Sequence, residues 1–228
     1  MSRPHPIKSN NRVRLFKGTA LAIYLISGGE LFVLTGFLLL LISGCSSGGG
    51  EVQAGRNALQ TNRPEAAVGY LASAAQIDPT YRIPYRVPAG VLGYLGRAYL
   101  ETGRPAEACR TLEKAVKIDP EDPFVPLYLG IAWMQTGERD RGRKEIGTGL
   151  RGIHETLEHI ASDSVSGIFW DPTRVIRSSI EKTLGSEVDD SQLEAAALQI
   201  GANFEQEIDA ARRRPAPCCA GGPRWRRR

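Results

Sequence analysis

The apolar residues of this chain recur at helical spacing over most of its length, and one arrangement of them occurs twice. Residues 62–67 are similar to residues 103–108, and residues 71–79 are similar to residues 112–120. Small and apolar residues return every three or four positions in each copy, which predicts amphipathic helices. The copies are offset by 41 residues, and the segment 82–88 between them contains two prolines. Because proline interrupts helical hydrogen bonding and restricts the residue before it, we expect this segment to be non-helical.

The repeated unit resembles the tetratricopeptide repeat, a pair of helices with a period of about 34 residues. Segment 89–122 carries the family's spacing best, in Leu95, Gly96, Tyr99, Gly103, Ala108, Leu112, Ala115 and Pro120. Segment 48–81 carries it in Gly55, Ala58, Ala67, Leu71, Ala74 and Pro79. Segment 123–156 is a more divergent copy, in which His154 stands where the closing proline is expected. The insert 82–88 accounts for the difference between the offset and the family's period.

The residue types have physical reasons in such a fold. Gly96 and Gly130 would let one helix approach its neighbour closely, and Pro64 and Pro105 suit the first position of a second helix, where no amide hydrogen is needed. The resemblance implies a right-handed solenoid of stacked helix pairs with a concave face. We therefore predict an all-α fold, a tetratricopeptide-repeat helix-hairpin solenoid of about three repeats over residues 51–156, capped by C-terminal helices over residues 157–211.

Two helices are expected behind the repeats, after a loop with an aromatic plug at residues 162–171. Asp171 and Pro172 should begin the first helix as its N-cap and first residue, and Gly185 should end it. Its apolar face would consist of Val175, Ile176, Ile180 and Leu184. A capping box at residues 191–194 should begin the second helix. Its apolar face would consist of Leu193, Ala197, Ile200, Phe204, Ile208 and Ala211.

The first 44 residues have the pattern of an export leader. Residues 1–17 are polar and basic, and residues 18–42 are apolar apart from Glu30 and a few small or hydroxylated side chains. Leu-Ile-Ser-Gly then precedes Cys45, and this arrangement resembles a bacterial lipoprotein lipobox. The resemblance implies that residues 1–44 are a lipoprotein signal peptide, that Cys45 receives a diacylglycerol, and that its new amine is acylated, for example by palmitate.

The location of the protein is predicted from the same motif. A lipid on Cys45, followed by a Ser/Gly tether at residues 45–50, implies a lipid-anchored protein of the bacterial cell envelope. Ser46 after the cysteine favours the outer membrane, facing the periplasm. The alternative is an uncleaved signal anchor that ends near a cysteine, which Glu30 and the long leader favour.

The net charge of +4 is unevenly distributed. Residues 1–44 carry +4 and residues 212–228 carry +7, so the body between them carries −7. An acidic body argues against nucleic acid as a partner. We expect the tail at 212–228 to be disordered, and either to contact anionic lipid or another polyanion, with Trp225 at the interface, or to have no role.

No catalytic or metal-binding pattern is found. His154 and His159 lie about 140° apart on a helix, whereas a metalloprotease pair needs a spacing of four residues. Cys109 is expected to be a small core side chain, and Cys218 and Cys219 lie in the tail. We therefore expect no enzyme, no cofactor and no small-molecule substrate.

In the tetratricopeptide-repeat family, the first helix of each repeat lines the concave groove. Carried over by position, this implies a partner-binding groove formed by Val52, Arg56, Leu59, Arg97, Leu100, Leu127, Tyr128, Ile131 and Met134. Arg56 and Arg97 hold equivalent positions, and guanidinium groups suit a carboxylate or phosphate on a ligand. The apolar residues suit the hydrophobic anchors of a peptide or helix. The alternative is that some of these residues pack against the insert or the C-terminal helices.

Together these observations predict a membrane-anchored scaffold that binds a protein or peptide partner in the groove. The alternative function is a membrane-surface or polyanion binder that acts through the arginine-rich tail.

Overall fold

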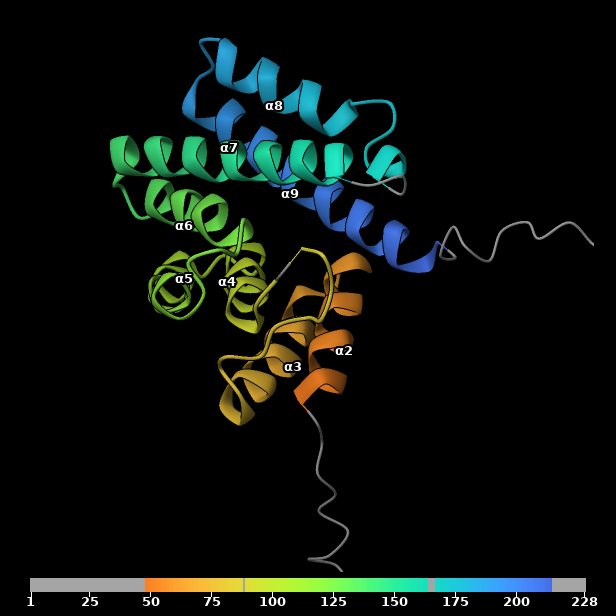
Figure 1. Ribbon diagram of the computed structural model, residues 1–228. Coiled ribbons are helices and arrows are strands. Elements are labelled where there is room, and N and C mark those ends of the chain that lie inside the picture. The colour runs from red at the N-terminus through yellow and green to blue at the C-terminus, as the bar shows by residue number, and fades with distance from the viewer. Residues whose placement is uncertain (1–47, 88, 164–166, 215–228) are drawn as a thin grey trace, which may run out of the picture. The chain divides into compact units, whose positions relative to one another are not determined.

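The computed structural model describes residues 48–87, 89–163 and 167–214, which are mostly helical (Figure 1). The chain divides into two compact units, Met1–Cys45 and Ser46–Arg228, and every described residue belongs to the second. The described residues form eight α-helices, one short 3-10 helix and no strand. The predicted signal peptide, Cys45 and most of the arginine-rich tail lie outside the described residues. The predicted bounds of the tether and the tail are wrong, because residues 48–50 form the first turn of a helix and a helix continues to Arg213.

Six of the helices form three successive pairs. The pairs are α2 (Gly48–Gln60) with α3 (Pro64–Ile77), α4 (Val91–Glu101) with α5 (Pro105–Ile118), and α6 (Phe124–Gln135) with α7 (Arg139–Asp163). Neighbouring pairs contact each other through α3 and α4 and through α5 and α6. The predicted helix-hairpin solenoid of about three repeats is therefore confirmed. α7 continues past His154 because no proline ends it there.

The turn inside each pair has the same geometry. Asn62, Gly103 and Gly137 have φ angles of 54°, 70° and 98°, in the left-handed region that asparagine and glycine tolerate. The amide of the next residue donates to the carbonyl five positions earlier at 2.8 Å, in the bonds Arg63–Ala58, Arg104–Tyr99 and Glu138–Trp133. This is the hydrogen bond of a Schellman motif, which ends the first helix of each pair.

Glycine allows the helices of each pair to touch. A Cβ atom on Gly55 would lie 2.5 Å from Cγ of Leu71, and one on Gly96 would overlap Leu112. A Cβ atom on Gly130 would lie 2.6 Å from the backbone nitrogen of Ile146. These overlaps explain why the repeats place glycine at these positions.

The insert between the first two pairs is non-helical, as predicted. Arg82 and Gly90 form an isolated antiparallel bridge, and the Ile83 amide donates to the Ala89 carbonyl at 3.0 Å. The ring of Tyr85 stacks on Trp170, with 6.1 Å between the ring centroids. The insert thus contacts the segment that follows the repeats.

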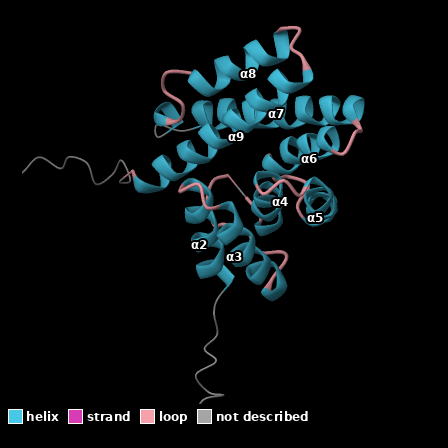
Figure 2. Ribbon diagram, turned by 180° about the vertical axis from the view of Figure 1, so that it is seen from behind, coloured by secondary structure: helices cyan, strands magenta, loops and turns pink. Residues whose placement is uncertain are grey.

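The C-terminal residues form η1 (Gly167–Phe169), α8 (Val175–Gly185) and α9 (Asp190–Arg213). α8 packs on α7, while α9 packs along α6, α7 and α8. Figure 2 shows α9 running from the region of α8 toward α2. All six apolar residues predicted to face inward from α9 are buried, which agrees with the expected cap: Leu193, Ala197, Ile200, Phe204, Ile208 and Ala211.

The predicted start of α8 at Pro172 is wrong, because the helix begins at Val175. Arg174 has a φ angle of 56° and interrupts the helical path just before it. Asp171 still caps the helix, since its carboxylate accepts the amides of Ile176 and Arg177, each at 3.1 Å. The predicted apolar face is also only half buried, because Val175 and Leu184 are 55% and 41% exposed.

The predicted capping box of α9 is displaced by two residues. Asp189 is the N-cap, its carboxylate accepts the amide of Gln192 at 2.8 Å, and the Gln192 side chain accepts the amide of Asp189. Ser191 instead donates to the Asp189 carboxylate at 2.7 Å. Both residues are suitable caps by type, and the structure selects the earlier one.

Candidate partner-binding groove

The first helices of the three pairs, α2, α4 and α6, face α9. All residues predicted to line an open groove are at most 8% exposed: Val52, Arg56, Leu59, Arg97, Leu100, Leu127, Tyr128, Ile131 and Met134. The expectation that they line an open groove is therefore wrong. α9 covers part of the set, through contacts with Arg56, Arg97 and Tyr128 among others, while Met134 packs against Gly142 of α7. Packing against the C-terminal helices is the alternative that the sequence leaves open. Their contact with a partner stays a prediction.

Arg56 on α2 is completely buried and pairs with two acidic residues of α9. Its Nη2 lies 2.8 Å from Oδ1 of Asp209, and its Nε lies 3.3 Å from Oε1 of Glu205. The guanidinium carbon also lies 5.1 Å from the ring centroid of Tyr94. The arginine of the first repeat is thus held by carboxylates that come from the far end of the chain.

Arg97 on α4 completes the cluster. Its Nη1 donates to Oε2 of Glu205, and its Nε donates to Oε1 of Glu101 at 2.7 Å. Glu205 therefore bridges the equivalent arginines of two repeats. The predicted preference of these arginines for carboxylates is met by the chain's own helix.

Burial dominates the electrostatics of this cluster. It raises the pKa of Glu205, against the lowering effect of Arg97 and Arg56. Burial by itself lowers the pKa of Arg56, but neighbouring groups that include Glu205 and Asp209 hold it above its usual value. Because these guanidinium groups and carboxylates are buried, removal of one partner would leave a buried charge without compensation.

The third repeat meets α9 through close apolar contacts as well as polar ones, such as the ion pair of Arg143 with Asp190 at 2.5 Å. A Cβ atom on Gly201 of α9 would lie 2.7 Å from Oη of Tyr128 and 3.1 Å from Cδ2 of Leu127. The rings of Phe124 and Phe204 are 5.3 Å apart at their centroids. α9 is therefore held by apolar packing and ion pairs at the third repeat, and by the buried ion pairs of Arg56 and Arg97 at the first two.

Part of the concave side remains open beside α9. A cavity of about 780 Å³ lies between the end of α2, the start of α8 and the second half of α9. Its lining includes Leu59, Gln60, Arg97, Val175, Asn203 and Gln206. α9 thus covers part of the groove but leaves a cavity beside the end of α2, in the first repeat.

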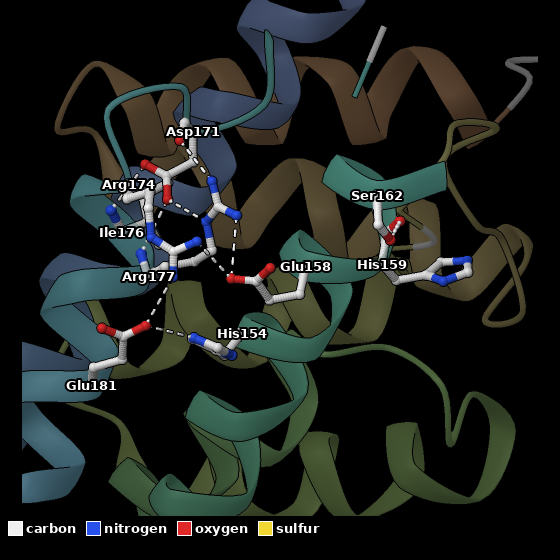
Figure 3. A network of polar contacts seen from close by, with 9 residues as sticks. All are labelled: His154, Glu158, His159, Ser162, Asp171, Arg174, Ile176, Arg177 and Glu181. Atoms are coloured by element: carbon white, nitrogen blue, oxygen red, sulfur yellow. Dashed lines mark hydrogen bonds and ion pairs between the residues drawn. The ribbon is translucent and has the colours of Figure 1, made fainter. Parts of the chain in front are cut away.

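A second polar network joins α7 to α8 and the segment before it (Figure 3). Its members are His154, Glu158, Asp171, Arg174, Arg177 and Glu181. His154 contacts Glu181 at 3.1 Å, whereas Figure 3 shows His159 away from this network. The two histidines therefore do not converge, and within the described residues no three His, Cys, Asp or Glu side chains gather where a metal ion could be held.

Cys109 on α5 is half-buried, and its sulfur lies 3.9 Å from Oγ1 of Thr136. Burial raises the pKa of its thiol, which disfavours the reactive thiolate. Cys218 and Cys219 lie outside the described residues.

Sequence reasoning had missed the roles of Glu205 and Asp209. Both stand next to apolar residues of the predicted inner face, Phe204 and Ile208, at the same spacing of four residues. Their position at the edge of the apolar face could have indicated that these acidic residues are buried. The pattern does not indicate which distant helix supplies their ion-pair partners.

The helical pairs, their turns and their close-contact glycines define a helix-hairpin repeat protein. Residues 58–123 match the family profile of the tetratricopeptide repeat, so this segment is a tetratricopeptide-repeat region. Repeats of this family suggest a scaffold for protein–protein interaction. No curated protein matches the chain.

Proposed function

We propose that this protein is a membrane-anchored scaffold of the bacterial cell envelope whose repeats bind a protein partner. The observation that carries the proposal is the cavity beside α9, because Leu59, Gln60 and Arg97 of the repeats contribute to its lining together with α8 and α9. Its volume falls within the range of about 300–1,000 Å³ that is typical of ligand sites.

The accessible lining of this cavity suits a peptide segment. Gln60, Asn203 and Gln206 carry side-chain amides, which can donate to and accept from a peptide backbone. Val175 is 55% exposed at the same cavity and offers an apolar contact. We therefore assign the partner's contact to this end of the groove.

Membrane attachment through Cys45 is part of the same proposal. The compact unit with the repeats begins at Ser46, and α2 begins at Gly48, so a lipid on Cys45 would hold the repeats close to the bilayer. Two or more acyl chains on one residue give stable anchoring. No helix in the described ranges is both long and apolar enough to cross a membrane.

Site-specific photocrosslinking in intact cells tests the partner contact. A photoreactive amino acid replaces Gln206 or Thr173, both exposed at the cavity, and a matched variant carries it at Glu155, exposed on α7. We expect the same protein adduct from both cavity positions and none from position 155, identified by mass spectrometry. Equal labelling at all three positions, or none at the cavity, would contradict the proposed surface.

Radiolabelled palmitate tests the anchor. The native chain should incorporate label and fractionate with membranes, and Cys45→Ala should do neither. Cys109→Ala serves as the control and should be labelled like the native chain. A native chain without label would rule out the lipid anchor and leave the partner contact standing.

A further inference from the structure

Two acidic residues of α9 face the only two arginines that the repeat pattern had placed at equivalent groove positions. Glu205 and Asp209 are four residues apart on one face of the helix, and they pair with Arg56 and Arg97 across the groove. From these contacts we propose that residues 204–213 of α9 occupy the place of the partner, whose binding element is an amphipathic helix with two acidic residues four positions apart. This inference rests on the proposed function and names the partner's chemistry.

The two arginines belong to the repeats, whereas the carboxylates do not. Arg56 and Arg97 are separated by the same 41 residues as the two repeat copies, so the repeated pattern places a guanidinium on each first helix. The carboxylates come from α9, a helix outside the repeats. They connect the arginine of the first repeat to the arginine of the second. α9 thus lies along the groove and pairs with arginines that recur at equivalent positions of the repeats. This is the geometry of a helix bound in a groove as a ligand.

The attachment of α9 differs between its neighbours. Its backbone packs closely along α6, α7 and α8, whereas no comparably close packing is found with α2 or α4. The second half reaches α2 and α4 through ion pairs, beside the cavity of about 780 Å³. This part of α9 therefore combines the ion pairs with an apolar face formed by Phe204, Ile208 and Ala211, all of which are buried.

The groove also keeps polar groups that α9 does not use. Nη1 of Arg56 and Oη of Tyr94 are buried, and neither has a hydrogen-bond partner among the described residues. A buried donor without an acceptor raises the free energy of the folded state. A partner helix with a further acceptor at this point would satisfy a group that α9 leaves unpaired.

Exchange of one acidic helix for another conserves the charge balance. A buried ion pair contributes little net stability, but its disruption leaves a charge without compensation. A partner that brings its own carboxylate pair replaces the interaction as it breaks it. The apolar face of the incoming helix then decides which helix is bound.

A labelled peptide with the sequence of residues 202–214 tests the inference by fluorescence anisotropy. The protein is the chain from Ser46 to Arg228, the compact unit that contains the repeats, without lipid. Glu205→Gln combined with Asp209→Asn loosens the internal helix, and this variant should bind the peptide at least tenfold more tightly than the native chain. The control Glu207→Gln, on the same helix, should bind it as the native chain does.

Two further arms show that the binding uses the arginines. Adding Arg56→Gln to the loosened variant should abolish peptide binding, and a peptide with both acidic residues replaced by their amides should not bind. Equal weak binding by native and loosened chains that both remain folded, as judged by circular dichroism, would overturn the inference. Dimers of the loosened variant in analytical ultracentrifugation would also overturn it, because the occupant would then be a second copy's α9.

Hydrogen exchange on the native chain covers the case in which the loosened variant does not fold. Amides of residues 205–213 should exchange at least tenfold faster than those of residues 193–204, and equal protection would overturn the inference. A crosslink at Gln206 that succeeds while the peptide fails would leave the scaffold function in place and remove only the acidic helix.

Discussion

Single residues set how closely the helices of this protein meet, and the sequence predicts some of them better than others. Gly55, Gly96 and Gly130 could be assigned from spacing alone, because the repeat brings the same two helix surfaces together each time. Glu205 and Asp209 could not be assigned, because nothing in their neighbourhood on the chain indicates Arg56 or Arg97. Local periodicity predicts which face of a helix is buried, and it does not predict the distant partner.

Gly96→Ala tests the close approach of α4 and α5. Because a methyl group there would overlap Leu112, we expect the free energy of unfolding to fall by about 1–3 kcal/mol. Gly69→Ala is the matched control, since its Cβ position on α3 is open, and it should raise the free energy of unfolding by about 0.5–1 kcal/mol. Urea unfolding followed by circular dichroism measures both, and effects of the same sign would contradict the packing argument.

Asp122 gives the molecule a pH dependence that can be isolated. Burial raises the pKa of Asp122 to about 6, although its carboxylate accepts the amides of Gly90 and Phe124. In the unfolded chain the pKa is about 3.9, so the folded state binds the proton more tightly and stability falls as pH rises from about 4 to 6. The shift corresponds to roughly 3 kcal/mol.

The difference in unfolding free energy between the native chain and Asp122→Asn should therefore change over that range, measured by urea titration at a series of pH values. The native chain should lose stability relative to the variant as the pH rises. Parallel pH profiles for the two chains would show that Asp122 ionises in the folded state as it does in the unfolded one.

At the scale of elements, helix ends are predicted well where the repeat constrains them and poorly elsewhere. The three turns inside the pairs share one left-handed residue and one hydrogen-bond pattern, so any copy predicts the others. α8 and α9 have no second copy, and each begins at a position that the local sequence leaves ambiguous. Asp171 caps α8 from four residues before its start, and Asp189 is preferred over Ser191 at the start of α9.

Asp189→Ala should lower the free energy of unfolding by about 1 kcal/mol, because the amide of Gln192 loses its acceptor. Ser191→Ala should change it by less than half as much, since Ser191 caps no backbone amide. Urea unfolding compares the two, and hydrogen exchange in the first turn of α9 should accelerate in Asp189→Ala alone. A larger loss of unfolding free energy in Ser191→Ala than in Asp189→Ala would support the predicted capping box, in which Ser191 is the N-cap.

At the scale of the whole molecule, the sequence predicts a solenoid with a C-terminal cap, and the structure adds that this cap covers part of the groove. The acidic body has its charge partly inside, where α9 neutralises the arginines of the first two repeats. This closure could not be predicted because it depends on the path of α9 over three helix pairs. A charge reversal at Arg56 or Arg97 would therefore disturb the fold as well as any partner contact.

Glu205→Ala should lower the free energy of unfolding by about 3–5 kcal/mol, because Arg56 and Arg97 lose a shared buried carboxylate. Glu207→Ala removes a partly exposed ion pair with Arg214 and should cost less than about 1 kcal/mol. Urea unfolding of both variants measures the contrast. Similar losses would show that the cluster does not hold α9 to the repeats.

The contact between Arg56 and Asp209 spans 153 residues of chain, and this separation affects how the protein is made. Repeat proteins stabilised only by neighbouring units can fold from any point and propagate. Here the first helix pair emerges from the ribosome long before the carboxylates that its arginine requires. Closing so long a loop slows folding, so the nascent chain carries a half-finished first repeat until the last helix is synthesised. A chain that ends before α9 would leave Arg56 of its first helix pair without carboxylates, and that pair would be open to proteases and chaperones.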